Sequence, residues 1–259
     1  MINLIEAEKS FKEYVKAYDV SDGNIELKIR HTYGVVKASE YITKSLKLNE
    51  EDIQLAKLIA LLHDIGRFEQ VKVTESFADN KKFDHAEYGA KILFKDNLIR
   101  SFIKENKYDN IIYKAIINHN RYKIEECLGE KELLHSKIIR DADKLDNFRV
   151  KEEDKLENIF PMKYNPDTII YEQISNKVYE DFMAKKSIFR DDIVNQVDMW
   201  ISYVAFIFDL NFKASLKYVE ENGYIDKLID RIEYKNDDTK QKMEQIRKCA
   251  KEYLSNKGR

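Results

Sequence analysis

Two residue types that shape turns are scarce in this chain of 259 residues, which contains only 2 prolines and 7 glycines. β-Hairpins and phosphate-binding glycine loops depend on these residues, so the composition argues against an all-β fold and against a glycine-loop α/β fold. Cysteine is also rare: Cys127 and Cys249 are too few for a disulfide framework or a thiolate metal cluster. This cysteine usage is typical of a reducing compartment, and we expect a cytoplasmic location.

Neither sign of charge is in excess, because 45 Lys and Arg residues stand against 47 Asp and Glu residues, for a net charge of −2. The chain therefore lacks a global basic field that would hold extended nucleic acid. Long hydrophobic runs are missing too, since the longest, residues 199–208, is about half of the ~20 residues that cross a bilayer. The sequence thus predicts neither an extended nucleic acid nor a membrane as a partner.

What the chain does have is helical periodicity along nearly its whole length. Residues 51–65 are apolar on every side over their last turns, which predicts a helix buried in the middle of the fold. Asn49 is placed as the N-cap of this helix and Gly66 as its end. Residues 72–82 and 121–130 are polar and are predicted to be loops. The other predicted helices cover residues 25–46, 84–97, 109–120, 131–147, 169–186, 190–221, 223–234 and 238–256.

Both prolines lie in one stretch, residues 160–166. This stretch cannot be a continuous helix, because proline lacks an amide donor and restricts the residue before it. We place the one break of the chain there. The sequence therefore predicts an all-α fold, with a helical core over residues 1–159 and a C-terminal helical extension, residues 160–259, packed on that core.

Most of the five histidines lie on predicted helices beside apolar residues. His63 is followed by Asp64 at the end of the buried helix, and a buried carboxylate is usually paired or bound to a metal. His119 shares a helix face with apolar residues, and Asp143 faces inward with the isoleucine one turn earlier. A single buried histidine is usually a hydrogen-bonded core residue, the role that we predict for His135. Several histidines on separate helices, with two inward carboxylates, favour a metal site instead.

The order of these residues resembles that of the HD-domain metal-dependent phosphohydrolases. The most specific segments are His-Asp-Ile-Gly-Arg at residues 63–67 and Asp-Ala-Asp-Lys-Leu-Asp at residues 141–146. The resemblance spans about residues 25–150 and implies an HD-domain helical bundle that holds a first metal and a second metal. The implied ligands of the first metal are His31, His63, Asp64 and Asp143, and the second metal shares Asp64 and is completed by His85 and His119.

Three features of the ligand set stay open at this point. Asp141 competes with Asp143 as the acidic ligand, and the register of the family favours Asp143. Some two-metal relatives carry paired histidines where this sequence has only Asn118-His119-Asn120, so one or two ions are expected. Imidazole and carboxylate ligands without thiolate suit Mn, Fe, Ni, Co or Zn, with Mg as a further option.

The resemblance implies a hydrolase of phosphate esters or anhydrides, acting on small nucleotide-type substrates with a metal-activated water. The implied catalytic residues are Asp64, Arg67 and Lys144, of which the two cations contact phosphate. Arg67 could instead be a solvated surface residue, and Lys144 could pair with Asp141 or Asp146. Two rival functions remain: an HD-fold di-iron oxygenase and a non-catalytic metal-binding signalling module. A homodimer is also left open.

Two further predictions concern glycines and cationic residues near the implied ligands. Gly34, Gly66 and Gly89 each lie three or four residues from a histidine of the set. Since glycine has no side chain, we expect these positions to let helices approach closely at the site. The remaining nearby cations, Arg121, Lys123 and Arg140, could also contact substrate, but surface positions are favoured for all three.

Overall fold

The computed structural model describes residues 2–74, 83–160 and 164–258, and the regular elements in these ranges are all helices, without a β-strand. The predicted all-α class is therefore confirmed. Of the loop predicted at residues 72–82, only the part up to Thr74 is described, and this part is helical. The rest of that prediction lies outside the described residues. The second predicted loop is irregular up to residue 129.

The chain folds into two compact units, Met1–Asp146 and Asn147–Arg259. The division falls inside helix α7 (Glu130–Glu153), ahead of the boundary predicted after residue 159. Pro166 begins a new short helix, with the Asn165 side chain accepting a hydrogen bond as its N-cap. Packing of residues 160–259 on the core stays a prediction.

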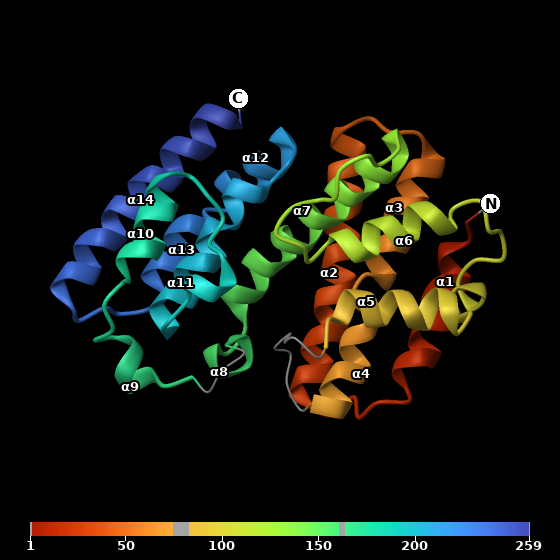
Figure 1. Cartoon of the computed structure of the whole chain (residues 1–259), viewed down its shortest axis with the longest axis horizontal. Helices are drawn as coiled ribbons and strands as arrows, with labels where there is room; N and C mark the ends of the chain where they lie inside the picture. Colours follow the sequence, from red (N-terminus) through yellow and green to blue (C-terminus); the bar gives the residue numbers. More distant parts are fainter. Residues whose placement is uncertain (1, 75–82, 161–163, 259) are drawn as a thin grey trace. The chain divides into compact units, whose positions relative to one another are not determined.

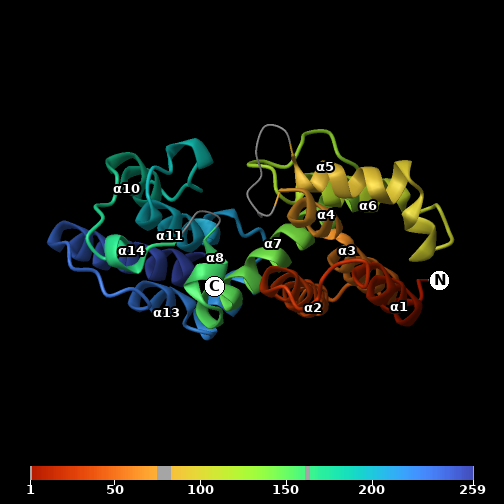
Figure 2. The ribbon, with the colours of Figure 1, turned by 90° about the horizontal axis from the view of Figure 1, so that it is seen from below.

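The first unit is a set of helices arranged around α3 (Figure 1). In both views α5 and α6 lie side by side (Figures 1 and 2). The elements of this unit are α1 (Leu4–Val15), α2 (Gly23–Ser45), α3 (Glu50–Leu62), α4 (Ile65–Thr74), α5 (His85–Ala90), the π-helix η1 (Lys91–Lys95), the 3₁₀-helix η2 (Leu98–Ser101), α6 (Asp109–Asn118) and most of α7.

Helix α3 forms the centre of this unit, as its apolar sequence predicts. Its residues Leu58 and Ile59 are fully buried. The start of the helix is fixed by Asn49, whose side chain accepts a hydrogen bond of 2.9 Å from the backbone N–H of Asp52. This is the predicted N-cap, and it satisfies a donor that the first turn leaves without a helical partner.

The end of α3 differs from the prediction. The helix stops at Leu62, and Gly66 lies inside the following helix α4 instead of ending α3. Gly66 is needed there for close packing, because a Cβ at this position would lie 2.2 Å from the carbonyl oxygen of His85. The early stop leaves His63 and Asp64 as a short link between two buried helices.

The second unit continues from the end of α7, and its predicted long helices are interrupted. The helix predicted at 190–221 is broken because Asn195 accepts a hydrogen bond from the N–H of Asp198 and so begins a separate helix there. The prediction of one helix over residues 169–186 is wrong for the same reason, since the Ser175 side chain caps the start of a separate helix. The elements are α8 (Leu156–Ile159), α9 (Pro166–Ile169), α10 (Asn176–Met183), η3 (Arg190–Asp192), α11 (Gln196–Val204), η4 (Ala205–Asp209), α12 (Lys213–Glu221), α13 (Tyr224–Asp230) and α14 (Asp237–Lys257).

The longest apolar run of the sequence packs inside this second unit. Trp200 is fully buried, and its indole N–H donates to the carbonyl of Leu228 at 2.9 Å. Ile201 and Val204 are buried beside it on α11. Across the described residues, no helix combines the length and the apolar character that crossing a bilayer requires.

Candidate metal centre

The predicted ligands come from five different places in the first unit. His31 lies within α2, His63 and Asp64 link α3 to α4, His85 is the first residue of α5, His119 directly follows α6, and Asp143 lies on α7. The four histidines and Asp64 are all buried. The side chain of Asp143 keeps 20% of its surface exposed. The cluster therefore has its most accessible side at α7.

The first group contains His31, His63 and Asp64, whose ligand atoms all lie within 4.8 Å of one another. Oδ2 of Asp64 is 3.9 Å from His31 Nε2 and 3.6 Å from His63 Nε2. Asp143 joins them, because its Oδ1 is 3.0 Å from His31 Nε2 and 3.8 Å from His63 Nε2. The structure thus brings together the four residues predicted for a first metal, and this geometry supports Asp143 over Asp141.

The second group contains Asp64, His85 and His119. Here the other carboxylate oxygen of Asp64, Oδ1, is 3.3 Å from His85 Nε2 and 3.6 Å from His119 Nε2. The two Nε2 atoms lie 3.0 Å apart. Asp64 therefore turns Oδ2 to the first group and Oδ1 to the second, the arrangement of a carboxylate that can bridge two cations.

Hydrogen bonds at Nδ1 orient the imidazole rings of His31, His63 and His119. His63 and His119 each place Nδ1 against the carbonyl oxygen three residues earlier, at 2.7 and 2.6 Å. His31 places Nδ1 at 2.8 Å from a carboxylate oxygen of Asp146. These oxygens accept, so Nδ1 carries a proton in each ring, and Nε2 of His63 and His119 can present a lone pair to the cluster. Nε2 of His31 instead faces a carboxylate oxygen of Asp143 at 3.0 Å, so this ring carries a second proton that a metal would displace. Histidines that bind metals usually have such a partner on the other nitrogen.

Two observations show that these residues fit divalent ions. His63 Nε2 is buried, yet it has no hydrogen-bond partner among the described residues. An orphaned buried polar atom costs about 1–3 kcal/mol, a cost that a metal bond would remove. In addition, ligand atoms at about 2.0–2.2 Å from a tetrahedral metal lie roughly 3.4 Å apart. The separations above, from 3.0 to 3.9 Å, bracket this value.

Electrostatics keep several ligands in the forms that bind metals. Burial lowers the pKa of His63 to about 4, so its imidazole is neutral at pH 7. Burial opposes the ionisation of Asp64, but the Lys28 ammonium and the neighbouring histidines hold the pKa of this carboxyl well below its ordinary value. Burial also lowers the pKa of His31, but its hydrogen bonds with Asp143 and Asp146 outweigh this and raise the pKa overall. Metal binding at His31 would therefore release a proton.

Two cations flank Asp64, and the sequence indicated one of them. Arg67 Nε lies 3.6 Å from Asp64 Oδ1, and the Arg67 side chain is only 15% exposed, so it is not a solvated surface residue. Lys28, which the sequence reasoning missed, places Nζ 2.8 Å from Asp64 Oδ2. Its signal is its spacing, three residues before His31 on one face of α2. Lys144 is buried on α7, and its contact with substrate stays a prediction.

The scarce glycines lie where helices touch beside the cluster. A Cβ on Gly34 would lie 1.9 Å from Oδ1 of Asp146, so α2 and α7 meet there. A Cβ on Gly89 would lie 3.2 Å from the backbone nitrogen of Gly66, where α4 and α5 meet. The prediction that these glycines permit close helix approach at the site is confirmed.

Three more residues around the cluster complete the comparison with the sequence. Asp146 is the partner of His31, a role that the sequence reasoning missed. Its signal is its spacing of three from Asp143, which places both acids on one helix face. His135 lies apart from the cluster and contacts Asp52 at 3.2 Å, as predicted for a structural histidine. The surface position expected for Arg140 is wrong.

Arg140 is only 2% exposed, because backbone carbonyls near the end of α6 supply partners for its guanidinium. By contrast, Arg121 and Lys123 are exposed as expected.

The asparagines on either side of His119 have partners away from the ligand atoms. Asn118 Oδ1 accepts from the backbone of Glu125 at 2.9 Å, and Asn120 donates to Asp84 at 3.1 Å. Among the described residues, the second group thus has one ligand fewer than the first.

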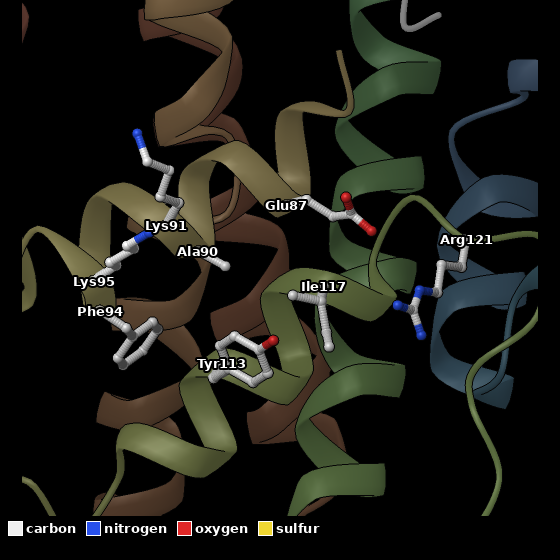
Figure 3. Close-up of a pocket in the computed structure, with 8 residues that line it drawn as sticks. All are labelled: Glu87, Ala90, Lys91, Phe94, Lys95, Tyr113, Ile117 and Arg121. Atoms are coloured by element: carbon white, nitrogen blue, oxygen red, sulfur yellow. The ribbon is translucent and has the colours of Figure 1, made fainter. Parts of the chain in front are cut away.

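A separate cavity of about 370 Å³ lies on other faces of the helices that carry the second group (Figure 3). Phe94 and Tyr113 form part of its wall, with ring centroids 5.6 Å apart in an edge-to-face contact. Glu87 and Arg121 point toward each other at one end (Figure 3). None of the candidate ligands is among the residues that line this cavity.

The fold and the site define a class of protein: a helical domain with buried His and Asp groups consistent with a metal site. Residues 29–147 match the HD domain family. This part of the chain is therefore an HD domain, as its residue order suggested. A search of curated proteins found no match, and a search of solved structures found none either.

Proposed function

We propose that the protein is a metal-dependent phosphohydrolase that cleaves esters or anhydrides of phosphate in small molecules, with nucleotides as the expected substrate class. One observation carries this proposal: Asp64 is shared between two buried groups and turns one oxygen to each. A buried carboxylate among several imidazoles is hard to explain without a cation.

The ligands divide between two sites in this proposal. His31, His63, Asp64 and Asp143 would hold one ion, and Asp64 with two further histidines would hold the other. Divalent ions bound there would lower the pKa of a coordinated water and neutralise charge on phosphate oxygens. The donor set of nitrogen and oxygen atoms suits Mn, Fe, Co, Ni or Zn.

The two cations beside Asp64 support an anionic substrate. Lys28 and Arg67 are each no more than 16% exposed on their side chains, and both contact the carboxylate that the metals would share. Once metal ions satisfy that carboxylate, a guanidinium and an ammonium at the rim can donate to phosphate oxygens. Lys144 is proposed as a third phosphate contact.

The test is metal analysis of the purified protein, followed by hydrolysis assays on a phosphoester panel. The panel contains p-nitrophenyl phosphate, bis-p-nitrophenyl phosphate and nucleoside mono-, di- and triphosphates, each with Mn²⁺, Fe²⁺, Co²⁺, Ni²⁺ or Mg²⁺. We expect metal-dependent release of product that chelation abolishes and added metal restores. The variant His63→Ala removes one proposed ligand. Its matched control is His135→Gln, a change at a buried histidine outside the cluster. Protein that binds none of these metals and hydrolyses none of the substrates would refute the proposal.

The same preparations separate the rival chemistry. Oxygen uptake by the iron-loaded protein without phosphoester hydrolysis would indicate an oxygenase. Metal binding without either activity would indicate a binding module.

A further inference from the structure

Arg140 is a buried arginine whose guanidinium donates hydrogen bonds to main-chain carbonyls. It lies on α7, three residues before Asp143, and is only 2% exposed. Its Nη1 donates to the carbonyl oxygens of Asn118 at 2.7 Å and Arg121 at 2.5 Å. Longer contacts reach the carbonyls of His119 at 3.4 Å and Tyr122 at 3.5 Å.

These carbonyls belong to the end of α6 and to the turn that follows it. A helix leaves its last carbonyls without partners, and its C-terminus carries partial negative charge. A cation that donates there satisfies both needs. Because His119 directly follows Asn118, the last residue of α6, Arg140 fixes the backbone from which a ligand of the second group projects.

Other hydrogen bonds at this turn have different roles. The His119 ring is oriented by the carbonyl of Ile116, but this bond lies within the end of α6 itself and does not place α6 against its neighbours. Asn120 donates to Asp84, the N-cap of α5. Arg140 supplies a link from this turn to α7, the helix that carries Asp143 of the first group. It thus connects the backbone of one group to the helix of the other.

Only an arginine can make this set of contacts. The guanidinium is planar and has five N–H donors in a fixed fork, whereas a lysine ammonium is a compact point charge. A neutral replacement would remove this donor from the buried carbonyls of Asn118 and His119.

We propose that Arg140 is a positioning residue for the second metal: it holds His119 at the distance from Asp64 and His85 that this ion requires. This inference rests on the proposed metal binding. It predicts that loss of Arg140 weakens the second ion selectively, because the ligands of the first ion are positioned by other contacts.

The experiment measures both ions by Mn²⁺ titration, with calorimetry and the spin-coupled EPR signal of a Mn²⁺ pair as readouts. The variants are Arg140→Met and Arg140→Lys, and the control is Arg149→Met, which removes an arginine of the same helix that bonds Glu153. We expect the first ion to bind within about threefold of wild type and the second at least tenfold more weakly in both Arg140 variants. The pair signal should be lost at Mn²⁺ concentrations that saturate wild type.

A readout without metal completes the test. Long-range ¹H–¹⁵N spectra of the metal-free protein report the ring nitrogens of each histidine. The signals of His119 should shift in Arg140→Lys, while those of His31 should not.

Three outcomes would overturn the inference: wild-type affinity for both ions, equal weakening of both ions, or full rescue by lysine. If Arg140→Met does not fold, Arg140→Lys carries the test. If wild type itself binds no metal, the proposed function fails, which is a different result.

Discussion

Replacing Gly34 by alanine tests the positioning of the first metal site at a single atom. The added Cβ would lie 1.9 Å from Oδ1 of Asp146, more than 1 Å inside normal contact. Either α2 moves away from α7 or the carboxylate rotates. Both responses disturb the 2.8 Å contact between Asp146 Oδ2 and Nδ1 of His31. The substitution therefore removes the orientation of a ligand without touching the ligand itself.

The change in unfolding free energy combines one stabilising contribution and two destabilising ones. Alanine gains about 0.5–1 kcal/mol over glycine within a helix. Overpacking costs about 1–3 kcal/mol, and loss of a charged hydrogen bond costs about 1.5–3 kcal/mol. We therefore expect net destabilisation of the metal-free protein by about 1.5–5.5 kcal/mol. Loss of a partner that orients a ligand usually weakens metal binding by about 10- to 100-fold, or roughly 1.4–2.7 kcal/mol.

The assay combines urea unfolding of metal-free protein with Mn²⁺ titration. The matched control is Gly23→Ala, the same substitution in the same helix, where an added Cβ meets nothing within 4 Å. Asp146→Asn should reproduce the loss of metal affinity without the steric clash. Wild-type Mn²⁺ affinity in Gly34→Ala would refute the reasoning, because the clash would then have been absorbed elsewhere.

Three other predictions follow from the site and its surroundings. Asp64→Asn should remove hydrolysis and lower the bound metal below one ion per chain, since both groups share this carboxylate; retention of both ions by metal analysis would contradict the assignment. His85→Ala should lose the second ion and keep the first, whereas loss of both in a Mn²⁺ titration would show that the division is wrong. Burial lowers the pKa of His135, so the unfolded chain binds a proton below pH 6.5 that the folded chain does not. The free energy of unfolding should then decrease as the pH is lowered from 7 to 5, with a contribution from this residue of at most about 1.4 kcal/mol per pH unit. His135→Gln should flatten the curve of unfolding free energy against pH.

The sequence allowed the helical class to be predicted from local patterns, whereas the full ligand set was implied by the resemblance to HD-domain proteins. Scarcity of turn residues and the helical period indicated the fold. His63-Asp64 and Asp143 on apolar helices indicated the cluster that the structure brings together. The glycine beside His31 also indicated a close helix contact.

What could not be predicted depends on contacts between distant parts of the chain. The buried position of Arg140 requires the end of α6 to lie against α7, which no local pattern reveals. The contact of Lys28 with Asp64 joins residues 36 apart in sequence. The prediction of one helix over residues 190–221 failed for another reason. The Asn195 side chain accepts a hydrogen bond from the backbone and starts a new helix, and the apolar run that follows does not indicate this break.

The central claim is that Asp64 bridges two metal ions. Its most direct test is anomalous diffraction from crystals of the protein grown with Mn²⁺, recorded near the manganese absorption edge. We expect two anomalous peaks per chain, one beside Oδ2 of Asp64 among His31, His63 and Asp143, and the other beside Oδ1 with His85 and His119. A map with fewer than two peaks beside Asp64, in crystals whose protein is saturated with Mn²⁺ in solution, would contradict this proposal.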